Sequence, residues 1–164
     1  MSRILIGVTV ALFLSACQTH QPVPEGYAGP TATLSDSGIG VSGAKAQLFV
    51  AQEIDGNKIV DSFGASASAS QGQGFRLYLQ VISRKLPVRQ LKVKLYGGVA
   101  TGAPIYALFD QLTGSVQSVD GIVDFTPVAG AAYTVKGDLR DTGSSIWIED
   151  DATHQPVTNK ITAK

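Results

Sequence analysis

The strongest indication of the fold lies in residues 75–97, FRLYLQVISRKLPVRQLKVKLYG. In residues 75–83, apolar residues stand at every second position, with arginine, tyrosine and glutamine between them. Residues 88–97 repeat the pattern with lysines between the apolar positions. A period of two is typical of a strand that buries one face. The stretch therefore predicts two strands, interrupted at residues 84–87.

Further strand signals extend over the rest of the chain. Residues 44–54 predict a strand that ends in the hairpin turn Asp55-Gly56-Asn57, and residues 144–149 predict another strand. Residues 65–70 alternate alanine with serine, and we interpret residues 63–70 as a strand with a thin inner face, the alternative being a small-residue loop. No stretch predicts a helix. The 18 glycines also favour strands joined by tight turns.

A tyrosine follows a proline- and glycine-containing corner near the end of the chain. Phe125-x-Pro127 ends one expected strand, and Tyr133 begins the next. In Greek-key sandwiches, a tyrosine in this position ties its hydroxyl to the backbone of the preceding loop. We therefore expect an all-β fold, an antiparallel β-sandwich of immunoglobulin-like or prealbumin-like type, with about eight to ten short strands.

The beginning of the chain has the three parts of a secretory signal peptide. Arg3 gives a positive start, residues 4–14 form an apolar run, and the small residues Ser15 and Ala16 follow. This run is shorter than the roughly 20 residues that a membrane-spanning helix needs. We therefore expect an export signal rather than a permanent span.

The four residues Leu14-Ser15-Ala16-Cys17 resemble the lipobox of bacterial lipoproteins. The resemblance implies that residues 1–16 are removed and that Cys17, the single cysteine, carries acyl chains. Gln18 stands where an aspartate often retains such proteins at the inner membrane, so the resemblance implies the outer membrane, facing the periplasm. The alternative is an ordinary signal peptide that ends near a free cysteine.

The mature chain divides into a tether and one domain. Removal of residues 1–16 from the 164 leaves 148, a size typical of a single domain. Residues 17–30 are rich in proline and glycine, and we expect them to be a flexible tether behind the lipid anchor. Residues 31–164 are expected to form the β-sandwich. The chain also resembles small Gram-negative lipoproteins with a Gly-Tyr-x-Gly-Pro segment (residues 26–30) and a strand like residues 146–150, a group with no assigned activity.

Charge gives one local signal. Thirteen basic residues balance thirteen acidic ones, so no overall attraction to nucleic acid is expected. Basic residues nevertheless gather in one part of the chain: Arg84, Lys85, Arg89, Lys92 and Lys94. These five predict a patch for anionic glycan, lipopolysaccharide phosphates or an acidic partner. They are also typical of a solvated sheet face or of an edge that lysines protect against aggregation, and we favour this second interpretation.

Catalytic and metal signals are weak. His20 and His154 are far apart in sequence, and the latter stands alone in the expected domain. Five acids lie near the end of the chain without the regular spacing of a calcium loop: Asp138, Asp141, Glu149, Asp150 and Asp151. Trp147 is interpreted as a core residue, with stacking on sugar as the alternative.

These observations lead to a hypothesis about function. We expect a membrane-anchored lipoprotein of the cell envelope that is a binding or structural module, not an enzyme, and that needs no cofactor or metal. Its expected partners are the membrane, through acylated Cys17, and an envelope protein or glycan, with the oligomeric state left open. An anionic-ligand binder and, as a weaker alternative, a hydrolase of envelope polymers are the other hypotheses.

Overall fold

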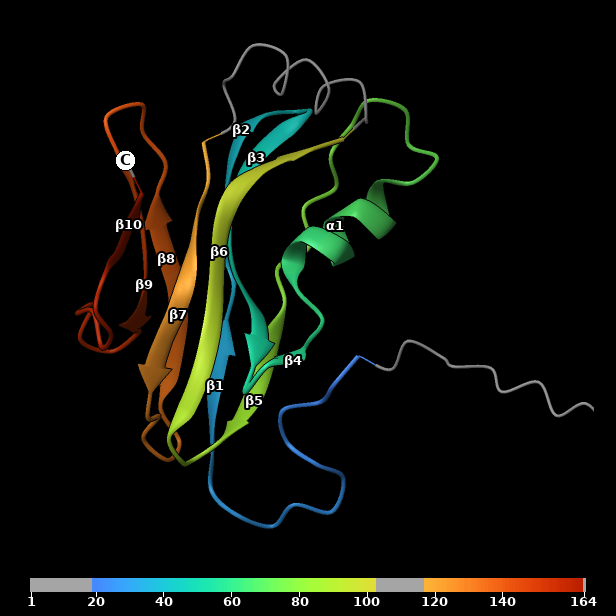
Figure 1. Ribbon diagram of the computed structural model, residues 1–164. Helices are drawn as coiled ribbons and strands as arrows, with labels where there is room; N and C mark the ends of the chain where they lie inside the picture. Colours follow the sequence, from blue (N-terminus) through green and yellow to red (C-terminus); the bar gives the residue numbers. More distant parts are fainter. Residues whose placement is uncertain (1–18, 103–116, 164) are drawn as a thin grey trace, which may run out of the picture.

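The structure is a computed structural model that describes residues 19–102 and 117–163. Two β-sheets face each other, and one short helix lies outside them (Figure 1). Sheet A has the strand order β10 (Ile161–Ala163), β9 (Ser144–Asp150), β8 (Ala132–Asp138), β1 (Thr31–Ser35), β5 (Ser83–Pro87). Sheet B has the order β2 (Ser37–Ser42), β3 (Lys45–Ile54), β6 (Leu91–Thr101), β7 (Val119–Phe125), with β4 (Asn57–Lys58) paired to β3. The helix is α1 (Ser62–Ser70).

The expectation of an all-β sandwich is confirmed. Strands β1 and β8 run parallel, and the other strand pairs in the described part of the chain are antiparallel. The described residues contain ten strands, which agrees with the expected eight to ten.

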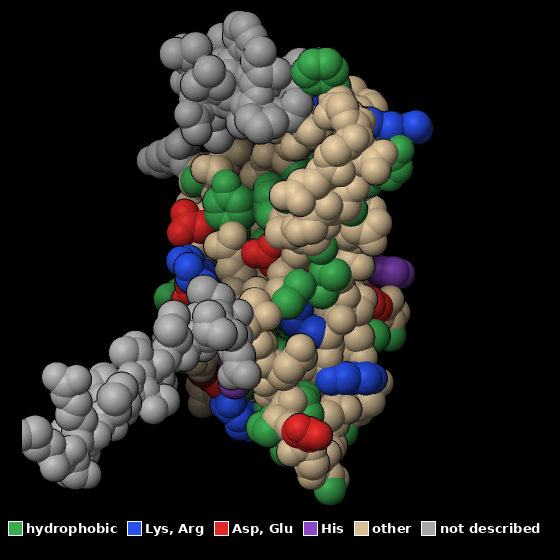
Figure 2. Space-filling view, turned by 90° about the vertical axis from the view of Figure 1, so that its right-hand side faces the viewer, with side chains coloured by type: hydrophobic (Ala, Val, Ile, Leu, Met, Phe, Trp, Pro, Cys, Tyr) green, Lys and Arg blue, Asp and Glu red, His purple; other side chains and the backbone are tan. Residues whose placement is uncertain are grey.

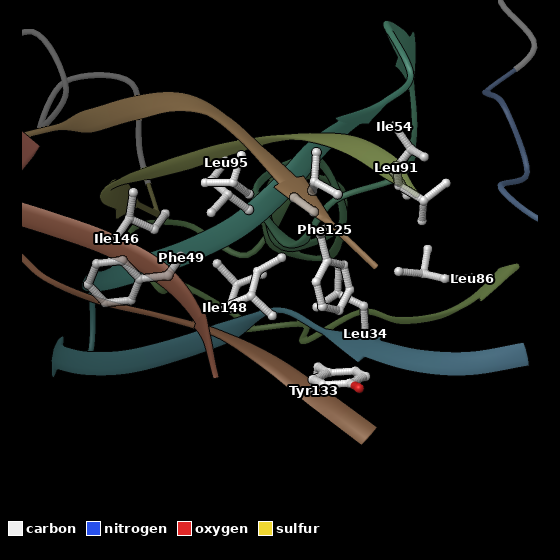
Figure 3. Packing of buried hydrophobic residues seen from close by; sticks show 14 of the residues in the cluster. Leu34, Phe49, Ile54, Leu86, Leu91, Leu95, Phe125, Tyr133, Ile146 and Ile148 are labelled. Atoms are coloured by element: carbon white, nitrogen blue, oxygen red, sulfur yellow. The ribbon is translucent and has the colours of Figure 1, made fainter. Parts of the chain in front are cut away.

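Apolar side chains from both sheets form the main core (Figure 3). Phe49 of β3 is part of this core, and two glycines make room for its ring. A Cβ atom added at Gly97 of β6 would come within 2.9 Å of the ring of Phe49, and one added at Gly137 of β8 would overlap the same ring. The ring thus fills space that glycines on both sheets leave open, and the sheets can approach closely there.

The predicted tyrosine corner is present. The backbone N–H of Val128, in the loop after β7, donates to the hydroxyl oxygen of Tyr133 on β8 at 3.0 Å. The ring of Tyr133 packs edge-on against Phe125, with the centroids 4.9 Å apart. The corner therefore joins the end of β7 to the start of β8, as the sequence pattern predicts.

Strand β3 is buried on both faces because a second apolar cluster covers the outer side of sheet B. Phe49 and Ala51 face the main core, whereas Leu48 and Val50 face outward into this cluster. The cluster is completed by Ala100 and by partly buried side chains of α1, β6 and the segment before β5: Phe63, Leu77, Leu79 and Tyr96. The helix and that segment therefore form a third layer (Figure 1).

The prediction of a strand at residues 63–70 is wrong, because these residues form α1. The carboxylate of Asp61 caps the helix by accepting from the N–H of Gly64 at 2.9 Å. Alanine and serine differ little in hydrophobicity, so their alternation is weak support for a strand. The same residues place Ser62, Ser66 and Ser70 four apart, which is the spacing of one helix face.

The prediction of a strand at residues 75–83 is also wrong. Residues 75–82, named the arm here, are extended but are not part of either sheet. Leu77 and Leu79 pack toward sheet B, whereas Phe75 and Val81 are exposed. Residues 84–87, predicted as an interruption, lie in strand β5.

Serine hydroxyls of α1 take the place of a neighbouring strand beside the arm. The N–H groups of Tyr78, Gln80 and Ile82 donate to Oγ atoms at 2.9 Å each, and the acceptors are Ser70, Ser66 and Ser62 in that order. Four residues of helix rise about 6 Å and two residues of strand about 6.6 Å. The two spacings match, so successive serines of this helix face accept from every second N–H group along the arm.

Candidate functional site

A buried ion pair joins the two sheets where the chain passes from one to the other. Asp36 lies between β1 of sheet A and β2 of sheet B and is 1% exposed. Nη1 and Nη2 of Arg84, on β5, donate to its two carboxylate oxygens at 2.7 and 2.8 Å. A charge is tolerated in the interior only when it is paired and hydrogen-bonded. This bidentate geometry meets both conditions.

Three further donors hold the same carboxylate. The N–H of Ala51 on β3 donates at 3.1 Å, and the N–H and hydroxyl of Ser62 donate at 2.9 and 2.7 Å. Asp36 therefore links β3, β5 and the first turn of α1. With five donors from the protein itself, this carboxylate serves the fold rather than a ligand.

A groove of about 410 Å³ lies beside this ion pair. Its wall is formed by the N-terminal segment at residues 20–23, by Ile59 and Val60, and by residues 82–85. Nη2 of Arg84 also donates to the carbonyl oxygen of Val60 at 3.2 Å, whereas its buried Nε has no partner among the described residues. The groove thus combines apolar side chains with the cationic side chains of β5.

The expected tether begins with a segment that lies against the sandwich. The N–H of His20 donates to the carbonyl oxygen of Lys58 at 3.0 Å, Pro22 is buried and Val23 is half-buried. Farther along, the N–H of Val88 donates to the carbonyl oxygen of Pro30 at 3.2 Å. The segment passes beside β4, on the same side of the sandwich as α1 (Figure 1).

The five basic residues predicted as a patch are divided between the sheets. Arg84 and Lys85 lie on β5 of sheet A, whereas Lys92 and Lys94 lie on β6 of sheet B. Arg89 lies in the connection between these strands. The structure therefore brings Arg84 and Lys85 together beside the groove and separates them from the two lysines of β6.

Carboxylates or hydroxyls lie close to all five basic groups. Besides the pair of Arg84 with Asp36, the contacts are Arg89–Asp55 at 2.6 Å, Lys92–Asp124 at 3.9 Å, Lys94–Glu53 at 3.4 Å and Lys85 Nζ–Thr33 Oγ1 at 3.0 Å. Exposed ion pairs contribute little to stability, but they reduce the positive potential that an anionic ligand would meet. Lys85 differs from the other four predicted patch residues, because its ammonium group contacts a hydroxyl rather than a carboxylate.

The predicted turn after β3 holds an acid with a perturbed pKa. Asp55 and Gly56 have φ angles of 52° and 78°, which confirms the turn. Oδ1 of Asp55 accepts from the backbone N–H of Lys92 at 2.9 Å, and Oδ2 accepts from Arg89. The N–H of Lys92 is the largest of the interactions that lower the pKa of Asp55, and Arg89 lowers it further.

Trp147 is not a core residue. Its neighbours Ile146 and Ile148 are buried between the sheets, so Trp147 lies on the outer face of β9 and is half-buried. Nζ of Lys160 lies 4.0 Å from the centroid of its ring, and its Nε1 donates to Glu149 at 3.3 Å. A sugar that stacked on this ring would have to displace Lys160.

The acids near the end of the chain are used locally. Oδ1 of Asp150 accepts from the N–H groups of Ala152 and Thr153 and from the hydroxyl of Thr153. The N–H of Thr153 is the main reason why the pKa of Asp150 is lowered. Within residues 19–102 and 117–163, no three histidine, cysteine or acidic side chains are grouped so that they could hold a metal ion.

The predicted lipidation site, Cys17, lies outside the described residues. Among the residues that are described, no helix has both the length and the apolar character to cross a membrane.

Sequence reasoning missed Asp36 and the serines that face the arm. The spacing of Ser62, Ser66 and Ser70 is a possible signal, because a polar stripe with a period of four fits a helix face better than a strand. Asp36 has no comparable local signal, since its partner Arg84 is 48 residues away.

No family model, no curated protein and no solved structure matches this chain. The function must therefore be argued from its own residues.

Proposed function

We propose that this chain is a lipid-anchored lipoprotein of the bacterial cell envelope and that its β-sandwich is a binding or structural module without enzymatic activity. The observation that carries the proposal is the signal-like run that ends in Leu14-Ser15-Ala16-Cys17. An acylated Cys17 would hold the protein to the outer membrane, facing the periplasm. Two or three acyl chains would make the anchoring stable, since a single chain binds only marginally.

The N-terminal geometry supports this proposal. An anchor needs the residues after the cysteine to be accessible, and Thr19, His20 and Gln21 are exposed at the surface of the sandwich. From there the chain continues along the outside of the domain to β1 (Figure 1). An anchor at Cys17 is therefore compatible with the folded sandwich, without any rearrangement of its strands.

The absence of enzymatic activity is also part of the proposal. The buried serines are plausible nucleophiles by residue type, but Ser62, Ser66 and Ser70 each accept from a backbone N–H of the arm. The buried carboxylate of Asp36 already accepts five hydrogen bonds from donors of the protein itself. These serines and this carboxylate hold the fold together, which favours a binding or structural role over hydrolysis of envelope polymers.

A second candidate is the binding of an anionic glycan or phosphate at the groove. The observation that favours it is the position of Lys85, which is exposed, lines the groove and has a hydroxyl as its partner. Binding of purified lipopolysaccharide that weakens steeply with added salt, and that is lost in Lys85→Gln, would support this candidate. Binding that is indifferent to salt would contradict it.

The test of the main proposal is the intact mass of the protein extracted from membranes. We expect the mass of residues 17–164 plus acyl chains, and we expect the Cys17→Ala variant to be released from the membrane fraction. An unmodified mature chain that is free in the periplasm would overturn the anchor.

A further inference from the structure

We propose that the sandwich rests on the phospholipid surface with one defined region, the anchor-side surface, made of Lys58, Val60 and Lys85 around the groove. This inference rests on the proposed acylation of Cys17. It adds that the domain has a fixed orientation on the bilayer, with the β4 and β5 edges of the two sheets toward the lipid.

The first argument is the short reach of the chain between the anchor and the domain. The hydrogen bond from His20 to Lys58 and the burial of Pro22 fix the segment to the sandwich. Only Gln18 and Thr19 separate Cys17 from His20, and three residues of extended chain span at most about 11 Å. The headgroup region adds roughly 5–7 Å on each side of the hydrocarbon. The domain therefore cannot stand far from the headgroups while this segment stays docked.

The second argument is the chemistry of the surface next to the docked segment. Val60 lines the groove and is 42% exposed, although it is apolar. Lys58 and Lys85 are exposed beside it. The carboxylate of Asp61, an acid close in sequence, is engaged as the cap of α1. Apolar side chains that enter the interface, together with lysines that reach lipid phosphates, are the groups that hold proteins on bilayers.

Figure 2 shows this side of the molecule. Hydrophobic side chains and side chains of lysine or arginine lie next to the N-terminal segment, below α1, with acidic side chains among them. The position of the segment and the character of the surface thus point to the same occupant, the lipid that the anchor enters.

The experiment uses the full, acylated chain in vesicles of phosphatidylethanolamine and phosphatidylglycerol. The thioether would consume Cys17, so a cysteine introduced elsewhere provides a single free thiol for an environment-sensitive fluorophore. The probes are Val60→Cys and Lys85→Cys. The matched control is Val157→Cys, since Val157 is also an apolar residue with 43% exposure. The N–H of Val157 donates to Ile148 of β9, and β8 and β1 separate β9 from β5, a distance of about 14 Å.

We expect a quencher attached to the lipid acyl chains to reduce the fluorescence at residues 60 and 85 several-fold more than at residue 157. Equal quenching at the three positions, or no quenching at either probe, would overturn the orientation. The latter result is also expected if a protein partner covers this surface instead of lipid.

The mass measurement separates this inference from the proposed function. An acylated, membrane-bound chain without selective quenching would refute the orientation and leave the anchor intact. A chain without acyl groups would refute the anchor itself and the orientation with it.

Discussion

Both terminal nitrogens of the Arg84 guanidinium donate to the carboxylate of Asp36, at 2.7 and 2.8 Å, inside the sandwich. The pair joins β5 to the crossing point between the sheets, and the same carboxylate also accepts from Ala51 and Ser62. One side chain thus connects the two sheets and the start of the helix.

Substitution of Asp36 should destabilise the domain strongly. In Asp36→Asn the charge of Arg84 stays buried without a counter-charge, and loss of one partner of a buried pair costs about 3–5 kcal/mol. The matched control is Glu53→Gln, which removes the partly exposed pair with Lys94 at 3.4 Å and should cost less than about 1 kcal/mol. Urea unfolding at constant slope measures both changes. Similar losses in the two variants would contradict the central role of Asp36.

Ser66 tests the contact between helix and arm. Ser66→Ala leaves the N–H of Gln80 without its acceptor, which should cost about 1–3 kcal/mol if the group stays buried. It should also increase the hydrogen-exchange rate of the Gln80 amide. Ser68→Ala is the control on the same helix, because the hydroxyl of Ser68 is exposed and donates to the helix carbonyl of Gly64. Unchanged exchange at Gln80 in Ser66→Ala would show that the serine does not hold the arm.

The arm explains why part of the fold could not be predicted from the sequence. The alternation in residues 75–83 correctly identifies an extended segment and the inward direction of Leu77 and Leu79. It contains no information about the partner of the backbone, which here is a row of serines rather than a strand. Where the partner is a regular strand, the same pattern is more successful: a strand is predicted at residues 88–97, and residues 91–97 lie in β6.

The candidate site shows the same division between local and distant information. The tyrosine corner could be predicted because Pro127 and Tyr133 are close in sequence. The ion pair of Asp36 with Arg84 could not, since it depends on the pairing of β1 with β5, in which Leu34 lies opposite Arg84. The basic patch is predicted from residues that are close in sequence. The structure separates them, because β5 and β6 belong to different sheets.

Gly137 should be intolerant of any side chain. The Cβ atom of Gly137→Ala would overlap the ring of Phe49 and would lie 2.7 Å from the backbone carbonyl oxygen of Ser145. Forcing extra atoms into a packed core typically costs about 1–3 kcal/mol. Gly40→Ala is the control, since a Cβ atom at Gly40 would have no atom within 4 Å. Thermal unfolding of both variants measures the difference. A smaller loss for Gly137→Ala in a Phe49→Leu background would show that the ring contributes to the loss, whereas an unchanged loss would assign it to the carbonyl oxygen of Ser145.

The pH dependence of stability should depend in part on Asp55. Its pKa in the folded protein is lowered, mainly by the N–H of Lys92 and also by Arg89, so the folded state favours the ionised carboxylate. A depressed pKa adds stability at pH values above the unfolded pKa of about 4, and this contribution is lost as the pH falls through the folded pKa. Asp55→Asn should therefore be less stable than the natural chain at neutral pH, and the difference should shrink below about pH 4. Asparagine tolerates the φ of 52° at this turn, so backbone strain does not confuse the comparison.

Urea unfolding of both proteins across this pH range measures that difference. Added salt provides the control, because it screens the exposed pair with Arg89 more than the backbone hydrogen bond to Lys92. Most of the difference should therefore persist in high salt, given that the N–H of Lys92 is the larger cause of the lowered pKa. A stability difference that is the same at neutral and acid pH would mean that the charge of Asp55 does not contribute to folding. A stability difference that vanishes in high salt would mean that the contribution of Asp55 comes from its pair with Arg89.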